Sequence, residues 1–346
     1  MIERINDNIL IGRGQRLYSL DTFKTLACFM VVLLHYPIDG VIGVYLAALA
    51  RIGVPFFFLV SGYFSYTEMY DQSRHIKRIK KYLFLLVGIT AVYWFKDIAR
   101  MAFGRITFAD FLSSNFTWEF LILHIGSSGF MWFVRALLYI ELLHMLLHKY
   151  LDSPKMKYVL VGLWIADILL IKYSFIFGFT IPQPYNEILT KMFGTAFLYY
   201  YIGRYIRHFA NECSTKSFNV FRVIALMTVF VLLNFTEVYV LDNYLINQMP
   251  ANYIMTFFLT VFIFLILLRY CNLGKGSIIN FVGKDLSMYV YYWHVLVGMM
   301  MGSICSRIHI PEILYSNVIT VFLASCLFGY VIFIVKRKFM VQKVRR

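Results

Sequence analysis

Charged residues are scarce in this chain of 346 residues. Asp, Glu, Lys and Arg together make up 15% of it, and the acidic residues number only 18. An average soluble domain carries charge on about a quarter of its residues. The chain also has only 5 Cys, with no CxxC pair and no nearby His at the spacing of a zinc site. We therefore expect neither a water-soluble globule nor a disulfide framework nor a metal centre.

The chain is rich in hydrophobic residues. They make up 60% of it, with 34 Phe and 26 Tyr, and the mean hydropathy is +0.69. So many aromatic side chains exclude a disordered chain, because they would not stay in water unburied. Long apolar runs recur from one end of the sequence to the other. This composition is typical of an integral membrane protein.

The apolar runs predict the transmembrane helices. A spanning helix needs about 20 mostly apolar residues, and strands cannot satisfy their backbone in lipid unless they close into a barrel. The windows that fit a helix are Leu20–Ile38, Val44–Tyr66, Tyr82–Met101, Gly129–His148, Tyr158–Phe175, Met192–Arg207, Val220–Val238, Ala251–Leu268, Leu286–Ile304 and Ile313–Val335. The sequence thus predicts an all-α, polytopic bundle of ten transmembrane helices.

The positive charge is explained by topology. The net charge is +15, and most of the 33 Lys and Arg fall on alternate segments, beginning with the N-terminal one. By the positive-inside rule, both termini are then cytoplasmic, and nucleic acid is not expected as a partner. Glu3 and Asp7 do not fit a cleavable signal peptide. We expect residues 1–346 to form a single membrane domain with no separate soluble domain.

The first window contains ionisable residues that are costly to place in a membrane. Lys24 and His35 are eleven residues apart, which puts them within about 20° on one helix face and about 16 Å apart along the axis. If the helix continues, Asp39 lies one turn beyond His35 on that face. The pattern favours a cation, a proton-accepting imidazole and an orienting carboxylate. Alternatively, Asp21 and Lys24 mark the membrane interface and His35 bonds a neighbouring helix.

Four stretches together resemble a known family. They are Arg16-Leu-Tyr-Ser-Leu-Asp21-Thr-Phe-Lys24 ending in His35, RIGVPFFFLVSGYF from Arg51, MWFVRALLYIELL from Met131, and VGKDLSMYVYYWH ending at His294. In this order they are similar to the membrane acyltransferase-3 proteins, which O-acylate bacterial surface glycans. The resemblance spans essentially the whole chain. Two departures are Lys24, where the family often has Arg, and Arg78-x-x-Lys81 in place of Arg-x-x-Arg.

The resemblance implies an activity and a set of site residues. It implies transfer of an acyl group, with acetyl the first expectation, from cytosolic acyl-CoA to a hydroxyl of a carbohydrate or lipid-linked glycan, in the bacterial cytoplasmic membrane. The catalytic candidates are His35 as general base, with Lys24 and Asp39. The candidates for binding the acyl-CoA phosphates are Arg74, Lys77, Arg78 and Lys81. The candidates for binding substrate are Asp21, Arg51, Ser61, Trp132, Arg135 and His294.

Each candidate also has a structural interpretation. The basic cluster around Arg78 can anchor the chain to anionic lipid, and His294 can be a buried histidine with its hydrogen bonds satisfied. Arg135 can rest on an aromatic ring, and Ser61-Gly62 can allow close helix packing. The alternative function is a ten-helix transporter of a small solute or amino acid that uses the same polar stripe. A third is a non-catalytic scaffold. Expected partners are membrane lipids, the acceptor, and a second copy or a glycan-assembly protein.

Overall fold

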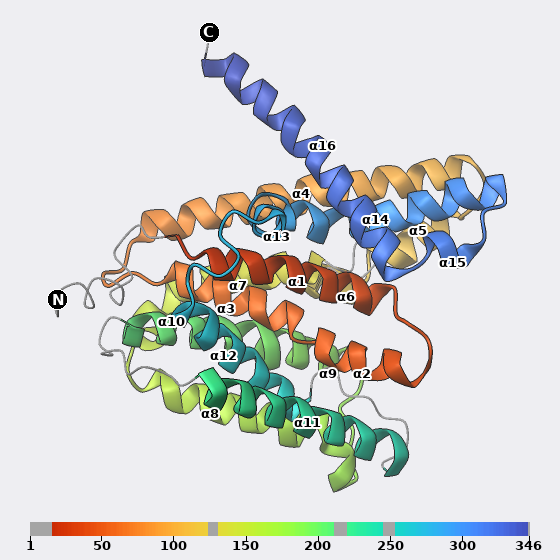
Figure 1. Ribbon diagram of the computed structural model, residues 1–346. Coiled ribbons are helices and arrows are strands. Elements are labelled where there is room, and N and C mark those ends of the chain that lie inside the picture. The colour runs from red at the N-terminus through yellow and green to blue at the C-terminus, as the bar shows by residue number, and fades with distance from the viewer. Residues whose placement is uncertain (1–15, 124–130, 211–219, 245–252, 345–346) are drawn as a thin grey trace. The chain divides into compact units, whose positions relative to one another are not determined.

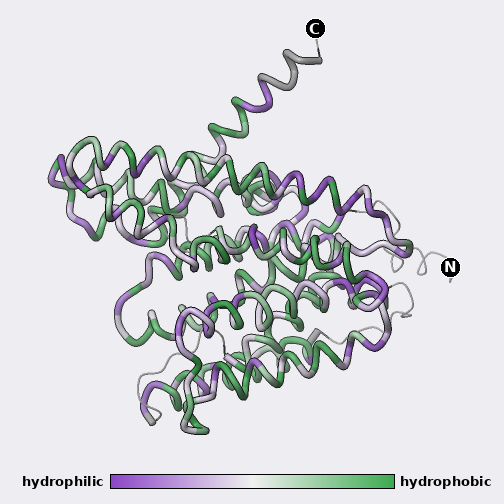
Figure 2. Tube along the Cα trace, turned by 180° about the vertical axis from the view of Figure 1, so that it is seen from behind, coloured by the Kyte–Doolittle hydropathy of each residue, from purple (hydrophilic) through white to green (hydrophobic). Residues whose placement is uncertain are grey.

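The computed structural model describes residues 16–123, 131–210, 220–244 and 253–344. It is 84% helix, and no strand occurs among the described residues. The predicted all-α class is therefore confirmed. Figure 1 labels the helices, and Figure 2 shows hydrophobic residues along much of their length.

The helices follow one another with short 3-10 and π segments, labelled η, between some of them. Their bounds are α1 Tyr18–His35, α2 Gly40–Ala50, α3 Gly53–Ser65, α4 Gln72–Ala102, α5 Phe108–Asn115, α6 Trp118–Leu123, α7 Trp132–Leu151, α8 Met156–Ala166, η3 Asp167–Lys172, η4 Ser174–Phe177, α9 Tyr185–Ile188, η5 Leu189–Phe197, α10 Leu198–Ala210, α11 Val220–Tyr244, α12 Ile254–Arg269, α13 Ile278–Phe281, η6 Val282–Leu286, α14 Ser287–Cys305, η7 Ser306–Ile308, α15 Glu312–Tyr315 and α16 Val318–Val344. Each predicted window overlaps a helix or a run of consecutive helices.

Some of these helices are long and apolar enough to cross a membrane. Within the described residues there are 4 by length and composition: Gly40–Ser65, Gln72–Ala102, Phe221–Asn243 and Val318–Lys338. Ile254–Arg269 is a shorter apolar helix. The chain is therefore a multi-pass membrane protein. Ten spans and cytoplasmic termini stay predictions.

The window Val44–Tyr66 corresponds to the candidate span Gly40–Ser65, but the helix in it is interrupted once. The helix breaks at Arg51 and Ile52, and the two pieces are α2 and α3. Pro55 is the reason, since it has no backbone N–H to donate to the carbonyl four residues earlier, which is that of Arg51. An arginine thus lies at a helix break inside a candidate span of 26 residues.

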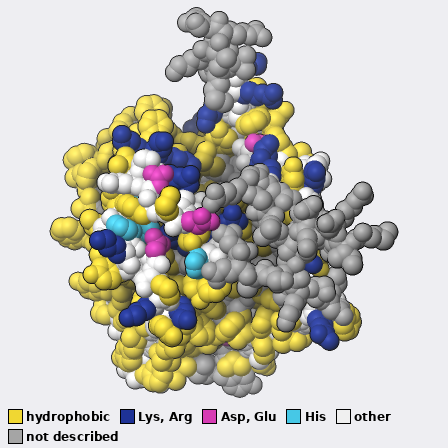
Figure 3. All heavy atoms as spheres, turned by 90° about the vertical axis from the view of Figure 1, so that its left-hand side faces the viewer, with side chains coloured by type: hydrophobic (Ala, Val, Ile, Leu, Met, Phe, Trp, Pro, Cys, Tyr) yellow, Lys and Arg dark blue, Asp and Glu magenta, His cyan; other side chains and the backbone are white. Residues whose placement is uncertain are grey.

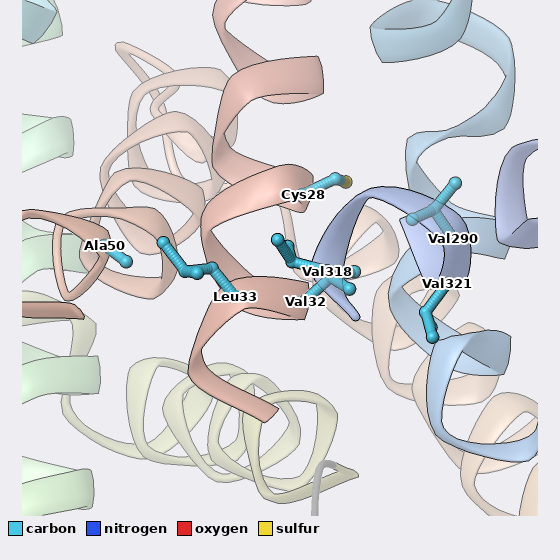
Figure 4. Close-up of a cluster of buried hydrophobic side chains, with 7 residues drawn as sticks. All are labelled: Cys28, Val32, Leu33, Ala50, Val290, Val318 and Val321. Atoms are coloured by element: carbon cyan, nitrogen blue, oxygen red, sulfur yellow. The ribbon is translucent and has the colours of Figure 1, made fainter. Parts of the chain in front are cut away.

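The helices form two compact units, which we describe separately. The first comprises Met1–Val60 and Phe209–Arg346, and the second Ser61–His208. In the first, one cluster of buried side chains surrounds α1: Cys28, Val32, Leu33, Ala50, Val290, Val318 and Val321. In Figure 4, Leu33 points toward Ala50, while Val32 lies on the side of Val318 and Val321. Helix α1 therefore packs on α2 with one face and on α14 and α16 with the other.

In the second unit, α4 packs along α7, and the end of α3 approaches α10. Gly62 makes this approach possible, because a Cβ there would lie 1.8 Å from the carbonyl oxygen of Tyr200. The sequence interpretation of Ser61-Gly62 as a close-packing pair is thereby confirmed for the glycine. Whether residues 1–346 are a single functional domain stays a prediction.

Candidate functional site

Two histidines predicted as site residues meet in the first unit. The ring centroids of His35 on α1 and His294 on α14 are 5.0 Å apart, with the ring planes inclined by 52°. His294 is completely buried. Its Nδ1 lies 3.1 Å and 2.9 Å from the carbonyl oxygens of Val290 and Tyr291, so Nδ1–H donates to them. The proton is therefore on Nδ1, and Nε2 carries the lone pair.

His35 is the last residue of α1, and its side chain keeps exposed surface. The helix ends here because Pro37 disfavours helical backbone at the residue before it, and Tyr36 has φ −129° and ψ 69°. One side of the His35 ring thus faces the buried His294, and the residue stays accessible from outside. A general base needs both features, a fixed position and a path for its substrate.

The expected place of Asp39 is corrected by this helix end. Asp39 is not one turn along the same helix from His35. It precedes α2 as the N-cap residue, has extended backbone with φ −71° and ψ 158°, and is exposed. Pro37 is again the physical reason, because it ends α1 before Asp39 is reached. The two residues therefore do not share a helix face, and this spacing does not support an orienting role of Asp39.

Lys24 and Asp21 lie together nearer the start of α1. Lys24 Nζ donates to Asp21 Oδ1 at 3.0 Å, and Arg16 Nε donates to Asp21 Oδ2 at 2.8 Å. Helix α1 places Lys24 about 16 Å along its axis from His35. The backbone here is tightly packed, since a Cβ on Gly283 would lie 1.7 Å from the Asp21 carbonyl oxygen. Lys24 thus shares the Asp21 carboxylate with Arg16 and lies eleven residues before His35 on the same helix.

The four basic candidates for the donor phosphates lie on the first turns of α4, in the second unit. Asp71 caps this helix, and hydrogen bonds from the side chain and backbone of Ser73 help to hold the pKa of Asp71 below its ordinary value. Arg74 pairs with Asp71 at 3.1 Å, while Lys77 and Lys81 are exposed on one helix face. These three are positioned like ordinary surface cations.

Arg78 differs from the other three because it pairs with a buried carboxylate. Its Nη1 lies 3.4 Å from Glu141 Oε1, and Glu141 is completely buried on α7. Glu141 also accepts hydrogen bonds from Tyr200 Oη at 3.0 Å and from His75 Nδ1 at 2.5 Å. Three donors around one carboxylate are what a buried charge requires. Arg78 is therefore fixed in orientation.

A second buried cluster in this unit centres on Arg204 of α10. Its Nη2 donates to Asp152 Oδ1 at 2.6 Å and its Nη1 to Ser65 Oγ at 3.1 Å. His144 links the cluster together, with Nε2 3.2 Å from Asp152 and Nδ1 2.9 Å from the Tyr201 hydroxyl. The ring of His144 stacks on that of His75 with centroids 4.7 Å apart. The two clusters thus form one polar network, in which Glu141, Arg204 and both histidines are buried.

Sequence reasoning missed most of this network. Glu141 lies inside the apolar window Gly129–His148, but the sequence alone assigned it no role, and His75, His144 and Arg204 were not singled out. Their signal was present, since His144 and Arg204 also lie inside apolar windows, where ionisable residues are costly. Figure 3 shows one face of the molecule on which basic side chains surround a few carboxylates and imidazoles.

The remaining substrate candidates make contacts that are structural in kind. The Arg51 guanidinium lies over the ring of Tyr253, 5.7 Å from its centroid. Trp132 receives Lys191 in the same way at 5.5 Å. Arg135 donates to the backbone carbonyl of Leu121 and lies 6.0 Å from the centroid of the Phe120 ring. The cation–π interpretation of Arg135 is therefore confirmed.

A further acid inside a predicted apolar window, Tyr158–Phe175, has a partner. Asp167 of η3 forms an ion pair with Lys172, and both side chains are buried. A Cβ on Gly194 would lie 2.0 Å from Asp167 Oδ1, so η5 approaches this pair through its backbone. Among the residues that the structure describes, no group of three His, Cys, Asp or Glu side chains is arranged to hold a metal ion.

Comparison with known proteins identifies the class of this membrane protein. The model of the acyltransferase-3 family, described as an acyltransferase domain, matches residues 17–337. The chain therefore belongs to the acyltransferase-3 family, as the four sequence stretches predicted, and is a membrane acyltransferase. No curated protein and no solved structure matches the chain.

Proposed function

We propose that this acyltransferase moves an acyl group, with acetyl the first candidate, from cytosolic acyl-CoA to a hydroxyl of a carbohydrate or lipid-linked glycan. The observation that carries the proposal is the His35–His294 pair within a chain of the acyltransferase-3 family. An accessible imidazole against a buried one suits proton transfer, because a neutral imidazole ring can accept a proton from a hydroxyl. Nothing in the pair needs a metal or a redox partner.

His35 is the proposed general base. Its neutral ring takes the proton of the acceptor hydroxyl while the oxygen attacks the thioester carbonyl carbon. The tetrahedral intermediate then collapses, the carbon–sulfur bond breaks, and the CoA thiolate leaves. The thiolate receives its proton from the imidazolium of His35. An ester and free CoA are formed, and the ring returns to its neutral state.

His294 is proposed to hold the His35 ring in place. Because Nδ1 of His294 is committed to two backbone carbonyls, the orientation of its ring is set by α14 itself. A base held by a rigid neighbour spends less time in unproductive orientations. Complete burial of His294 also keeps this side of His35 free of water.

The donor phosphates are proposed to bind at the start of α4. Lys77 and Lys81 are exposed and four residues apart, and Arg78 between them is held by Glu141. A guanidinium fixed in advance costs less side-chain entropy on binding phosphate than a mobile one. Lys24, which is held by Asp21 on α1, is proposed as a cation of the catalytic set with His35.

The proposal includes the membrane location, the topology and the partners of the enzyme. It lies in the bacterial cytoplasmic membrane, with ten spans and both termini in the cytoplasm. Its surroundings are membrane lipids, and a second copy or a glycan-assembly protein is its expected protein partner. Cytoplasmic termini place the start of α4 on the side where acyl-CoA is available.

Labelled acyl-CoA tests the reaction. The purified protein is incubated with acyl-labelled CoA and a membrane extract, and the glycan and lipid fractions are counted. We expect label in one of these fractions with the wild type and none with His35→Ala of normal folding. Solute uptake into liposomes without CoA turnover would instead support the alternative function, a transporter, and overturn the proposal.

A further inference from the structure

The connection between α4 and α7 contains two short helices of defined structure. Helix α5 begins at a capping box, in which Asp110 N–H donates to Thr107 Oγ1 at 3.1 Å and Thr107 N–H donates to Asp110 Oδ2 at 2.8 Å. The backbone hydrogen bond from Thr107 holds the pKa of Asp110 below its ordinary value. We call residues 103–122 the connecting segment. It is an ordered element and not a plain loop.

One side of the connecting segment is fastened to α4. Trp94 of α4 donates from Nε1 to Asn115 Oδ1 at 3.0 Å, and Asn115 is completely buried. The Trp94 ring also stacks on Phe116 and Phe120, with centroids 5.4 Å and 6.2 Å apart and both ring pairs inclined by 30°. Phe111 completes this buried side at 9% exposure. Both α5 and the start of α6 are thus held against α4.

A second attachment comes from α7. Arg135 donates to the carbonyl of Leu121, and its guanidinium lies over the Phe120 ring. Both contacts are to α6, so this arginine ties the far end of the connecting segment to the start of α7. The segment is therefore held from two neighbouring helices.

Beside its attached side, the segment exposes large apolar side chains. The exposed fractions are 81% for Phe103, 61% for Phe108, 40% for Leu112 and 74% for Trp118. Four such side chains within 16 positions form a patch that water would not favour. Aromatic residues of this kind, Trp above all, are enriched where a membrane meets water.

The polar residues of α5 lie on a third side. At 100° per residue, Phe108 and Leu112 share one direction, whereas Asp110, Ser113 and Ser114 point roughly the opposite way. All three polar residues are exposed. The helix thus has a buried, an apolar exposed and a polar exposed side, as helices lying in a membrane surface do.

The neighbouring surface of α4 indicates what covers the apolar side. Near its end at Ala102, this candidate span exposes Phe95 at 73% and Ile98 at 48%, and in a membrane these side chains contact lipid. The connecting segment begins at the next residue, so its apolar side continues a surface that lipid already covers. We propose that the connecting segment lies in the membrane surface, with Phe108, Leu112 and Trp118 among the lipids and Asp110, Ser113 and Ser114 in water.

The proposal gives Arg135 a positioning role. It holds α6 at the membrane surface, beside the first turn of α7, through the Leu121 carbonyl and the Phe120 ring. The patch on the connecting segment is independent of the proposed reaction, because none of its residues belongs to the candidate catalytic or donor-binding sets.

Site-specific fluorescence tests the proposal. An environment-sensitive dye is attached to single cysteines at Leu112, Trp118, Ser113 and Ser114, in a protein whose five native cysteines are replaced by alanine. The protein is placed in phosphatidylethanolamine–phosphatidylglycerol vesicles. We expect nitroxide-labelled lipid to quench the dyes at 112 and 118 at least threefold more than those at 113 and 114, and aqueous iodide to show the reverse. Equal quenching at all four positions overturns the proposal. So does shielding of 112 and 118 from both quenchers, which would indicate a protein partner.

A second measurement needs no cysteine replacement. Brominated lipid quenches tryptophan near the membrane surface, and Trp118 is the exposed tryptophan of the segment. We expect a smaller quenched fraction of total tryptophan fluorescence in Trp118→Phe than in the wild type. An unchanged fraction contradicts a position among the lipids. Neither experiment uses an acyl donor, so failure here leaves the proposed reaction standing.

Discussion

The ring of His294 lies 5.0 Å from that of His35, centroid to centroid, and the two residues come from helices at opposite ends of the chain. His35 ends α1 and stays accessible, whereas His294 is buried and bonded to its own helix backbone. One ring is therefore in a position to meet a substrate, and the other is in a position to hold it.

Removal of the proposed base is the first prediction. We expect His35→Gln to lower kcat for acyl transfer by about 100- to 10,000-fold, the usual contribution of a general base. The KM for acyl-CoA is expected to change little, because the donor phosphates bind elsewhere. Steady-state kinetics in detergent or vesicles measures both constants. A kcat within threefold of the wild type would remove His35 from the mechanism.

Replacement of His294 is expected to lower kcat as well, but by less than replacement of His35. His294→Phe keeps a ring of similar size beside His35 but loses both hydrogen bonds to the α14 backbone. We expect kcat to fall by about tenfold to a hundredfold, less than for His35, because the base is still present. A loss as large as that of His35→Gln would show that His294 itself moves a proton.

Loss of the buried carboxylate Glu141 is expected to destabilise the protein. Glu141→Ala leaves Arg78 and His75 without their common acceptor, and breaking a buried pair costs about 3–5 kcal/mol. The thermal unfolding temperature in detergent reports this loss. The control is Asp71→Asn, a carboxylate with 41% side-chain exposure that caps α4, the helix of Arg78 and His75; a surface substitution of this kind is expected to change stability by no more than about 0.5 kcal/mol. Equal effects of the two substitutions would contradict the burial argument.

Alanine substitutions at two glycines of the second unit are expected to change the stability of the protein in opposite directions. At Gly62 a Cβ would lie 1.8 Å from the Tyr200 carbonyl oxygen, so Gly62→Ala forces α3 and α10 apart at a cost of about 1–3 kcal/mol. At Gly88 on α4 nothing lies within 4 Å of the added atom. There alanine is expected to stabilise by about 0.5–1 kcal/mol through helix propensity. Thermal unfolding of both variants checks the signs, and a stabilised Gly62→Ala would be incompatible with the close approach.

Charge reversal on α4 tests the donor site without disturbing the buried network. Lys77→Glu and Lys81→Glu change exposed residues, whereas a change at Arg78 also removes a partner of Glu141. We expect each reversal to raise the KM for acyl-CoA by about fivefold, on the basis of about 1 kcal/mol for an exposed ion pair. The effect is expected to shrink at high salt. Lys157→Glu, an exposed cation on α8, is the control, and an equal rise there would indicate general electrostatics.

Local sequence signals, above all the apolar runs, predicted where the helices lie. All ten apolar windows overlap helices, since a run of apolar residues in lipid has no other way to satisfy its backbone. The interruption at Arg51 and the end of α1 before Asp39 were not predicted, and both come from prolines, Pro55 and Pro37. Both are local features, so these two helix ends were predictable in principle.

The hydrogen-bond partners of the buried charges could not be predicted from local sequence signals. The spacing of residues does not show that Glu141 accepts hydrogen bonds from His75, Arg78 and Tyr200, because these partners come from two other helices, α4 and α10. A helix face can be computed from sequence, but the helix that packs against it depends on the whole arrangement.

The sequence by itself determined the all-helical membrane class and the family, because both depend on apolar runs and on motifs that are local in the chain. The tertiary structure decided that Lys24 pairs with Asp21 and that His35 meets His294. It also decided that Arg78 is held by a buried carboxylate. The physical reason is that each buried charge or imidazole must find its hydrogen-bonding partners in space, and only the packed helices bring them within reach.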